Sequence, residues 1–158
     1  RDRFALDGRS RRPPRDRMNA LLSFLYAMWM NDCRSACEAA GLDPQVGFLH
    51  ALRPGRAALA LDLMEEMRPL ADRLALTLIN RLEIAHGDFT EREGGAVMLE
   101  GDARKAVVVA FQERKREAMV HPLLAERVPL GLVPLVQARL LARHLRGEAA
   151  AYQPFATR

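Results

Sequence analysis

A run of apolar residues at helical spacing, from Asp16 to about Ala40, limits the fold of this chain more than any other sequence feature. Leucine, methionine and tryptophan recur on nearly every side of the helix that this spacing predicts, at positions 21, 22, 25, 28 and 29. A helix that is apolar all round belongs in the centre of a core. Asp16 is expected to cap its start, and Gly41, followed by Pro44, to end it.

Helical periodicity returns later in the chain. A second helix is predicted from about residue 56, and Pro69 should kink it or end it before the pattern resumes. Further helices are predicted over about residues 103–120 and, after broken turns around Pro129, up to about Arg146. Gly94–Gly95, flanked by Phe89-Thr90-Glu91 and by Ala96-Val97-Met98-Leu99, predicts a short hairpin. The expected fold class is therefore all-α, a multi-helix domain with at most one short β-hairpin near residues 89–99.

Composition places these helices in one globular domain. The chain has 158 residues, of which 49% are apolar, so it is neither intrinsically disordered nor long enough for two full-sized domains. No apolar run reaches the roughly 18–20 residues of a membrane span. The two cysteines, Cys33 and Cys37, exclude a disulfide scaffold, and a cytoplasmic location is expected. The sequence opens at Arg1 without an initiating methionine, so we expect a piece of something longer.

The excess positive charge is concentrated at the N-terminus. Residues 1–17 hold seven arginines and three aspartates, which accounts for the whole formal net charge of +4. Because Pro13 and Pro14 resist helix formation, residues 1–17 are predicted to form a basic arm or linker before a helical domain over residues 18–158. Two interpretations of the arm stay open. It contacts nucleic-acid phosphates, with Arg11 and Arg12 as candidates, or it is a solvated arginine-rich linker.

One stretch combines residue types that bind metal ions. Asp62 and Glu65 lie three residues apart on the second predicted helix, so both carboxylates project from one face about a turn apart. His50 lies in the preceding loop, from which it can fold back over that face. Two carboxylates and an imidazole suit Mg²⁺ or Mn²⁺. Spacing alone leaves a second interpretation open, with a structural histidine and ordinary ion pairs from the carboxylates to Arg56 or Arg68.

Three ordered motifs resemble a single protein family. The first is Arg12-Pro13-Pro14 followed by the segment 19–26, and the second is Gly41-Leu42-Asp43-Pro44 with Gly47-Phe48-Leu49-His50. The third runs from Gly55-Arg56 through residues 59–66 to Arg68-Pro69 and Asp72-Arg73-Leu74. In this order they resemble the CRISPR-associated endonuclease and integrase Cas1, nearest to its type I-C branch.

This resemblance implies a helical catalytic domain of an enzyme that joins spacer DNA into a CRISPR array, in which a DNA 3′-hydroxyl attacks a phosphodiester. The family's metal-binding histidine matches His50, and its acidic pair matches Asp62 and Glu65, with Glu65 the more direct ligand. These three are the expected catalytic residues, and Mg²⁺ or Mn²⁺ is the expected cofactor. Nearby arginines would contact the DNA backbone without reading sequence: Arg53, Arg56 and Arg73.

The resemblance also implies features that this sequence lacks. The family has a further glutamate ligand and an N-terminal β-rich domain that mediates dimerisation, and both would fall before Arg1. We therefore expect a C-terminal domain with an incomplete metal shell and little or no turnover alone. In the full-length protein the implied partners are prespacer and CRISPR-repeat DNA, a second copy of the protein, the adaptation protein Cas2 and the nuclease Cas4.

A second hypothesis requires no catalysis. The charges after residue 17 balance to zero, which allows a non-enzymatic helical module that binds nucleic acid or a partner protein through the arm. A purely structural helical domain is the third possibility. The arrangement of His50 relative to Asp62 and Glu65 separates these hypotheses, because a shared cation requires the three side chains to converge.

Overall fold

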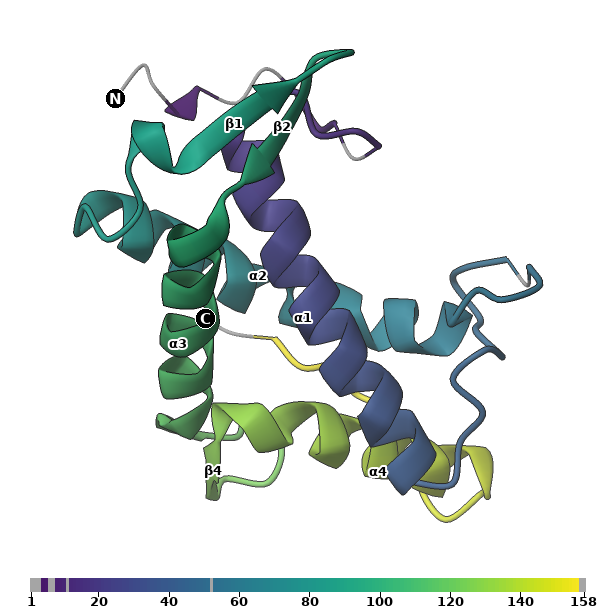
Figure 1. Cartoon of the computed structure of the whole chain (residues 1–158). Helices are drawn as coiled ribbons and strands as arrows, with labels where there is room; N and C mark the ends of the chain where they lie inside the picture. The colour runs from purple at the N-terminus through teal and green to yellow at the C-terminus, as the bar shows by residue number, and fades with distance from the viewer. Residues whose placement is uncertain (1–3, 6–7, 11, 52, 157–158) are drawn as a thin grey trace. The chain divides into compact units, whose positions relative to one another are not determined.

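The computed structural model describes residues 4–5, 8–10, 12–51 and 53–156 and shows a mostly helical chain (Figure 1). In this described part the α-helices are α1 (Arg17–Ala39), α2 (Ala58–Asn80), α3 (Gly101–Arg116) and α4 (Val133–Leu145). Two antiparallel strand pairs accompany them: β1 (Phe89–Arg92) with β2 (Ala96–Leu99), and β3 (Ala118–Val120) with β4 (Arg127–Pro129). The all-α fold class is confirmed.

Both ends of α1 are set by the residues predicted to set them. The Asp16 carboxylate accepts the backbone N–H of Asn19 at 2.7 Å, as an N-cap residue does. At the other end Gly41 has φ +75°, and the N–H of Leu42 donates to the carbonyl of Cys37 at 2.9 Å. This is a Schellman motif, in which a left-handed glycine allows the last carbonyls of the helix to be satisfied.

The second helix, α2, continues through Pro69 rather than ending there. Proline has no N–H, so the carbonyl of Glu65, four residues earlier, loses its helical hydrogen bond. Apolar residues on both sides of the proline are nevertheless buried, with Met67 at 0% and Leu70 at 3% exposure. Burial of this face stabilises the helix by more than one lost hydrogen bond costs.

The chain divides into two compact units, and the first consists of residues 1–27 and 70–113. In this unit the predicted hairpin is confirmed, with Phe89 opposite Leu99 and Arg92 opposite Ala96. Gly94 and Gly95 both have positive φ in the turn, which suits residues without a Cβ. The core of the unit is formed by apolar residues of α1, α2, β2 and α3: Leu21, Leu25, Leu74, Leu78, Val97, Leu99, Val107 and Phe111.

The described part of the N-terminal arm packs on this first unit. Arg9 donates to the side chain of Asn19 at 2.7 Å, and its guanidinium lies 4.8 Å from the centre of the Tyr26 ring. The N–H of Val97 in β2 donates to the carbonyl of Pro14 at 2.9 Å. A cation over an aromatic face and a buried amide partner hold this segment in place, so part of its arginine content serves the fold.

The second unit consists of residues 28–69 and 114–158. The helix predicted up to about residue 120 ends at Arg116, and β3 pairs with β4 where helical turns were expected, with Ala118 opposite Pro129 and Val120 opposite Arg127. A proline at position 122 disfavours the helical conformation for the residue before it, and the short apolar run 118–120 pairs as a strand instead. The core of this unit includes residues from α1, α2, α4 and the C-terminal tail: Trp29, Cys33, Leu63, Met67, Val133, Leu141 and Phe155.

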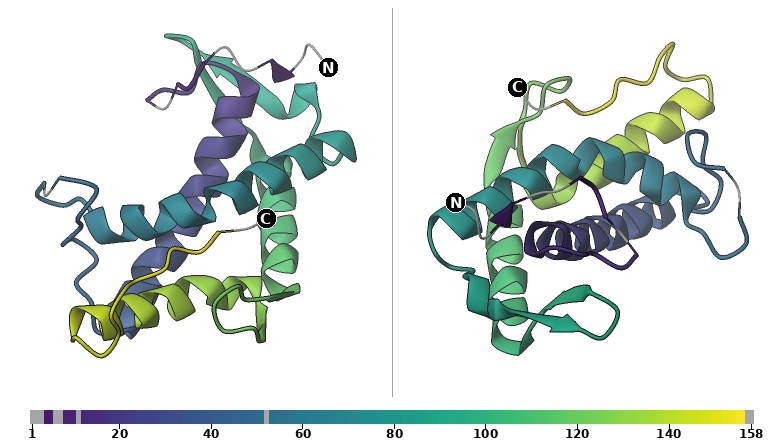
Figure 2. Two further views of the ribbon diagram at one scale, coloured as in Figure 1. Left: turned by 180° about the vertical axis from the view of Figure 1, so that it is seen from behind. Right: turned by 90° about the horizontal axis from the view of Figure 1, so that it is seen from above.

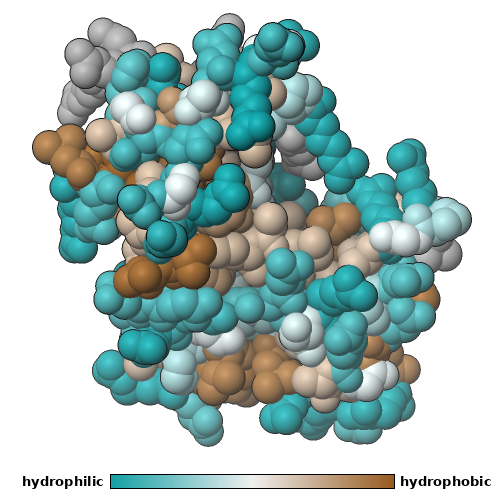
Figure 3. Space-filling view, in the orientation of Figure 1, coloured by the Kyte–Doolittle hydropathy of each residue, from teal (hydrophilic) through white to brown (hydrophobic). Residues whose placement is uncertain are grey.

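Hydrophobic residues that remain at the surface form separate patches on a largely hydrophilic face (Figure 3). Among the described residues, no helix combines the length and the apolarity that crossing a membrane requires.

Candidate functional site

The loop between α1 and α2, described at residues 40–51 and 53–57, leads to the start of α2 (Figures 1 and 2). Hydrogen bonds to Asp62 hold the backbone and ring of His50 against the first turns of α2. The carbonyl of Pro44 accepts the N–H of Leu59 at 2.9 Å, which satisfies one of the donors that a helix start leaves free. Gly47 lies so close to the helix that a Cβ there would stand 2.7 Å from the backbone carbonyl carbon of Ala58. The site therefore depends on a glycine at this point of closest approach.

Asp62, in the second turn of α2, anchors this loop. Its side chain is only 1% exposed. Carboxylate oxygen Oδ2 accepts the backbone N–H groups of Phe48 at 2.7 Å and Leu49 at 3.1 Å. Oδ1 accepts the backbone N–H of His50 at 3.0 Å. Donors from three consecutive residues thus offset the cost of burying this charge.

The same carboxylate orients the imidazole of His50. Nδ1 of His50 lies 2.6 Å from Oδ1 of Asp62. Because an ionised carboxylate only accepts hydrogen bonds, Nδ1 carries a proton, and in the neutral imidazole the lone pair is on Nε2. A histidine whose second ring nitrogen donates to a carboxylate is the arrangement typical of metal-ligating histidines.

Glu65 lies one turn further along α2 and has a different partner. Its carboxylate pairs with Arg68 at 2.8 Å, and its side chain is 32% exposed. This is the ion pair that the second interpretation of the sequence expected. Within the described ranges, no three His, Cys, Asp or Glu side chains are arranged as a metal shell. The structure therefore brings His50 and Asp62 together, whereas the Glu65 carboxylate is paired with Arg68.

The arginines predicted to contact DNA lie in different parts of the chain. Arg53 and Arg56 belong to the site loop, where the N–H of Arg56 donates to the carbonyl of Arg53 at 3.0 Å across a turn with Gly55 at φ +73°. Arg12 and Arg73 are exposed residues of the first unit. Arg11 lies outside the described residues.

A buried polar network next to Glu65 was not predicted from the sequence. The Glu66 carboxylate accepts the Tyr152 hydroxyl at 2.6 Å, the Phe155 N–H at 2.7 Å and the Gln137 side-chain amide at 2.8 Å. Burial raises the pKa of Glu66, and these three hydrogen bonds partly oppose that rise. Gln137 also contacts His121, because the His121 Nε2 lies 3.1 Å from the Gln137 amide oxygen.

A sequence signal for this network existed. Glu66 falls at helical spacing among apolar residues, three after Leu63 and four before Leu70, and so lies on the apolar face of α2. An acid at such a position needs buried partners. Spacing could flag Glu66, but it could not identify partners that are more than 70 residues away along the chain.

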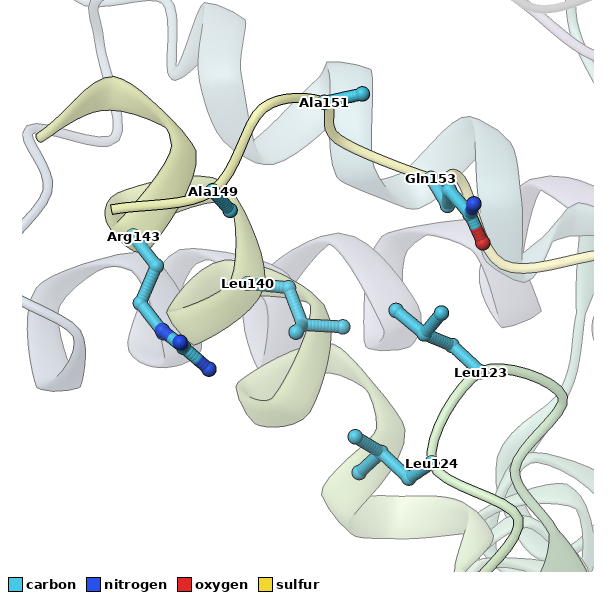
Figure 4. A pocket seen from close by; sticks show the side chains of 7 residues that line it. All are labelled: Leu123, Leu124, Leu140, Arg143, Ala149, Ala151 and Gln153. Atoms are coloured by element: carbon cyan, nitrogen blue, oxygen red, sulfur yellow. The ribbon is translucent and has the colours of Figure 1, made fainter. Parts of the chain in front are cut away.

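A separate pocket of about 320 Å³ lies in the second unit (Figure 4). Its lining is mainly apolar and comes from α4, the segment before β4 and the C-terminal tail: Leu123, Leu124, Leu140, Arg143, Ala149, Ala151 and Gln153. None of the predicted site residues lines this pocket, and we assign it no role in the chemistry.

Sequence relatives of this chain are CRISPR-associated proteins. CRISPR-associated endonuclease Cas1 1 of Moorella thermoacetica is 62% identical over 156 residues, which are 98% of this chain and 46% of the relative. Cas1 2 of Rhodospirillum rubrum is 63% identical over 153 residues, 96% of this chain and 44% of the relative. A Cas4/Cas1 fusion of Geobacter sulfurreducens is 46% identical over 156 residues, 98% and 28% of the two chains. The chain thus spans about half the length of the first two relatives.

Solved structures with the same fold include a Cas1 protein from Thermotoga maritima, with a TM-score of 0.84 and 30% identity over 93% of this chain and 45% of that one. A chain of a Cas6-RT-Cas1–Cas2 complex has a TM-score of 0.84 and 26% identity, over 98% of this chain and 17% of that one. Residues 1–113 match the family model of CRISPR associated protein Cas1. This chain therefore belongs to the Cas1 family of CRISPR-associated proteins.

Proposed function

We propose that this chain supplies the catalytic helical domain of a metal-dependent DNA endonuclease and integrase that acts in CRISPR adaptation. The observation that carries the proposal is the pair of His50 and Asp62, with 2.6 Å between Nδ1 and Oδ1 and a carboxylate that is 1% exposed. This pair leaves Nε2 of His50 available for Mg²⁺ or Mn²⁺. The names of the sequence relatives, CRISPR-associated endonucleases, support the activity.

The three predicted site residues then divide into two roles. His50 and Glu65 would hold the cation, Glu65 by exchanging its partly exposed ion pair with Arg68. Asp62 would act mainly through His50, because its two oxygens already accept four hydrogen bonds. The donor set, one imidazole nitrogen and one carboxylate, fits a divalent cation whose remaining positions are filled by water and phosphate oxygens.

The proposed reaction is an in-line displacement at a phosphodiester. A cation held by His50 and Glu65 would neutralise charge on the phosphate oxygens. The oxygen of a DNA 3′-hydroxyl or of water would form a bond to phosphorus as the bond from phosphorus to the leaving oxygen of the attacked strand breaks. Asp62 orients His50, and Arg53 and Arg56, in the same loop, would bind the DNA backbone without reading its sequence.

We further propose that the chain works as the C-terminal part of a longer protein. The two metal donors are fewer than a complete shell requires, so an upstream glutamate and an N-terminal β-rich domain would complete the enzyme, and the chain alone would show little or no turnover. Prespacer and repeat DNA are the proposed substrates, and a second copy of the protein is a proposed partner. The Cas6-RT-Cas1–Cas2 neighbour and the Cas4/Cas1 fusion support Cas2 and Cas4 as further partners.

The test compares histidine variants of the full-length parent with branched DNA in Mg²⁺ or Mn²⁺. His50→Ala should lower nicking and integration by about 100-fold or more, as expected for loss of a metal ligand. His86→Ala is the matched control, because His86 is an exposed histidine outside the site, and it should leave the rate unchanged. Full activity of His50→Ala would contradict the proposal. If deletion of residues 1–17 abolished DNA binding and His50→Ala changed nothing, the non-enzymatic module would be supported instead.

A further inference from the structure

Two large apolar side chains face solvent immediately before His50. Phe48 is 59% exposed and Leu49 is 71% exposed. Single exposed apolar residues are ordinary on protein surfaces. These two differ because they are adjacent, they include an aromatic ring, and they lie next to the proposed metal ligand.

The backbone that carries them is held in place. Asp62 accepts the N–H groups of both residues, at 2.7 Å for Phe48 and 3.1 Å for Leu49. Gly47, directly before them, lies against the start of α2. One buried carboxylate therefore sets the backbone of Phe48 and the imidazole of His50 together. A ring on a fixed backbone binds a partner at a lower entropic cost than a ring on a mobile loop.

The charge of the loop favours nucleic acid as that partner. Residues 41–57 contain two arginines, Arg53 and Arg56, and a single acid, Asp43. The two guanidinium groups have no ion pair among the residues that the structure describes, so their charge is available to a phosphate backbone. Positive charge beside an exposed aromatic ring is the combination with which proteins bind single-stranded nucleic acid.

We propose that Phe48 is a positioning residue that stacks on a nucleobase adjacent to the phosphodiester held at His50. Paired bases inside a duplex expose their edges and not their faces, so the ring selects DNA with an unpaired or unstacked nucleotide at this position. Stacking tolerates any base, and Phe48 would fix the geometry of the strand without reading its sequence. This inference rests on the proposed function and adds a DNA contact to it.

The test measures DNA binding, integration and Mn²⁺ binding of the full-length parent. Phe48→Ala should weaken DNA binding and slow integration by roughly tenfold, the loss expected for one base–aromatic contact, with Mn²⁺ affinity unchanged. Phe48→Tyr and Phe48→Trp should keep the DNA affinity and the integration rate of the parent because they keep an aromatic face. Leu145→Ala is the control, since Leu145 of α4 is also well exposed, at 63%, and it should change nothing.

An abasic nucleotide next to the scissile phosphodiester identifies the stacked base. With this substrate, Phe48→Ala and the parent should bind equally, because the base that the ring contacts is gone. Equal binding of intact DNA by the parent and Phe48→Ala would overturn the inference. It would also be overturned if Phe48→Ala weakened only the association with Cas2 or a second copy. Full activity of His50→Ala would instead contradict the proposed function. The two results are distinguishable, because the DNA-binding comparison of Phe48 variants tests only the stacking contact.

Discussion

At the scale of single residues, Asp62 determines the geometry of the candidate site. Its carboxylate accepts hydrogen bonds from the backbone of Phe48, Leu49 and His50 and from the His50 ring. It is 3% exposed as a residue, and removal of the carboxylate would take the acceptor from all four of these donors. The structure therefore gives Asp62 a role in folding the loop as well as a role in orienting His50.

We expect Asp62→Asn to destabilise the chain by about 1–3 kcal/mol, because the amide NH₂ replaces one acceptor oxygen and faces buried donors. Asp43→Asn is the matched control. Asp43 accepts the Gln45 N–H at 2.9 Å in an exposed turn, and the change should stay within about 0.5 kcal/mol. Urea unfolding of the metal-free chain measures both. Unchanged stability of Asp62→Asn would show that Asp62 serves the metal site alone.

Gly47 supports a second prediction at this scale. Gly47→Ala should destabilise the chain by about 1–3 kcal/mol, since the new Cβ would stand 2.7 Å from both the Ala58 carbonyl carbon and Asp62 Oδ2. Gly101→Ala is the control, with no atom within 4 Å of its Cβ and no positive φ. It should be neutral or slightly stabilising. Equal effects of the two substitutions in thermal unfolding would refute the close approach of loop and helix.

The sequence identified the site residues by type but not by role. Motif and spacing selected His50, Asp62 and Glu65, and placed both carboxylates on one helix. They could not show that Asp62 is buried under the loop while Glu65 pairs with Arg68. That distinction depends on how the loop docks on α2, which is a tertiary contact that spacing along the chain does not encode.

At the scale of elements, α2 anchors two segments that lack regular structure. Asp62 holds the loop before the helix, and Glu66, one turn later, holds the C-terminal tail through Tyr152 and Phe155. Asp62 is satisfied by donors of its loop, and Glu66 by two donors of the tail and by Gln137 of α4. In each case a buried carboxylate accepts backbone N–H groups that would be bonded to a neighbouring strand in a sheet, and so holds an irregular segment in place.

Glu66 makes the stability of the chain depend on pH. Burial raises its pKa above the ordinary value of 4.5, so in the folded state it retains a proton at pH values where the unfolded chain has lost it. Stability contributed by the protonated form is therefore lost as pH rises from about 4.5 through the folded-state pKa. Glu66→Gln cannot titrate, so the parent should lose stability relative to this variant across that window.

Chemical unfolding of the parent and Glu66→Gln at a series of pH values measures this difference. We expect the unfolding free energy of the parent to fall relative to that of Glu66→Gln as pH rises through the window, and the difference to level off above it. A constant difference, or a parent that gains stability relative to the variant as pH rises, would show that burial does not raise the pKa of Glu66.

Helices and the first hairpin were predictable because their signals are local. The spacing of apolar residues in α1, its Asp16 cap and its Gly41 end, and the Gly94–Gly95 turn all act within a few residues. The pairing of β3 with β4 was not predicted, because the helical spacing of the preceding residues was extended through Ala118–Val120. Helix α2 continues through Pro69 because burial of its neighbours Met67 and Leu70 outweighs the local effect of the proline.

At the scale of the whole molecule, each compact unit joins segments that are distant in sequence, residues 1–27 with 70–113 and residues 28–69 with 114–158. Composition alone indicated one helical domain and could not indicate this division. Charge counting placed the excess of arginine at the N-terminus, yet Arg9 serves the first unit through Asn19 and Tyr26. Net charge reports on partners and solubility, and it does not report which charged groups the fold uses.

We propose that His50 presents Nε2 to a divalent cation while Asp62 holds Nδ1. Broadening of histidine ring resonances by Mn²⁺ tests it on the chain itself, which contains four histidines. We expect the His50 resonances to broaden at the lowest Mn²⁺ concentration, and Asp62→Asn to weaken this effect. His86, His121 and His144 should broaden later or not at all. Broadening centred on any of those three, or no selective effect at His50, would contradict the account.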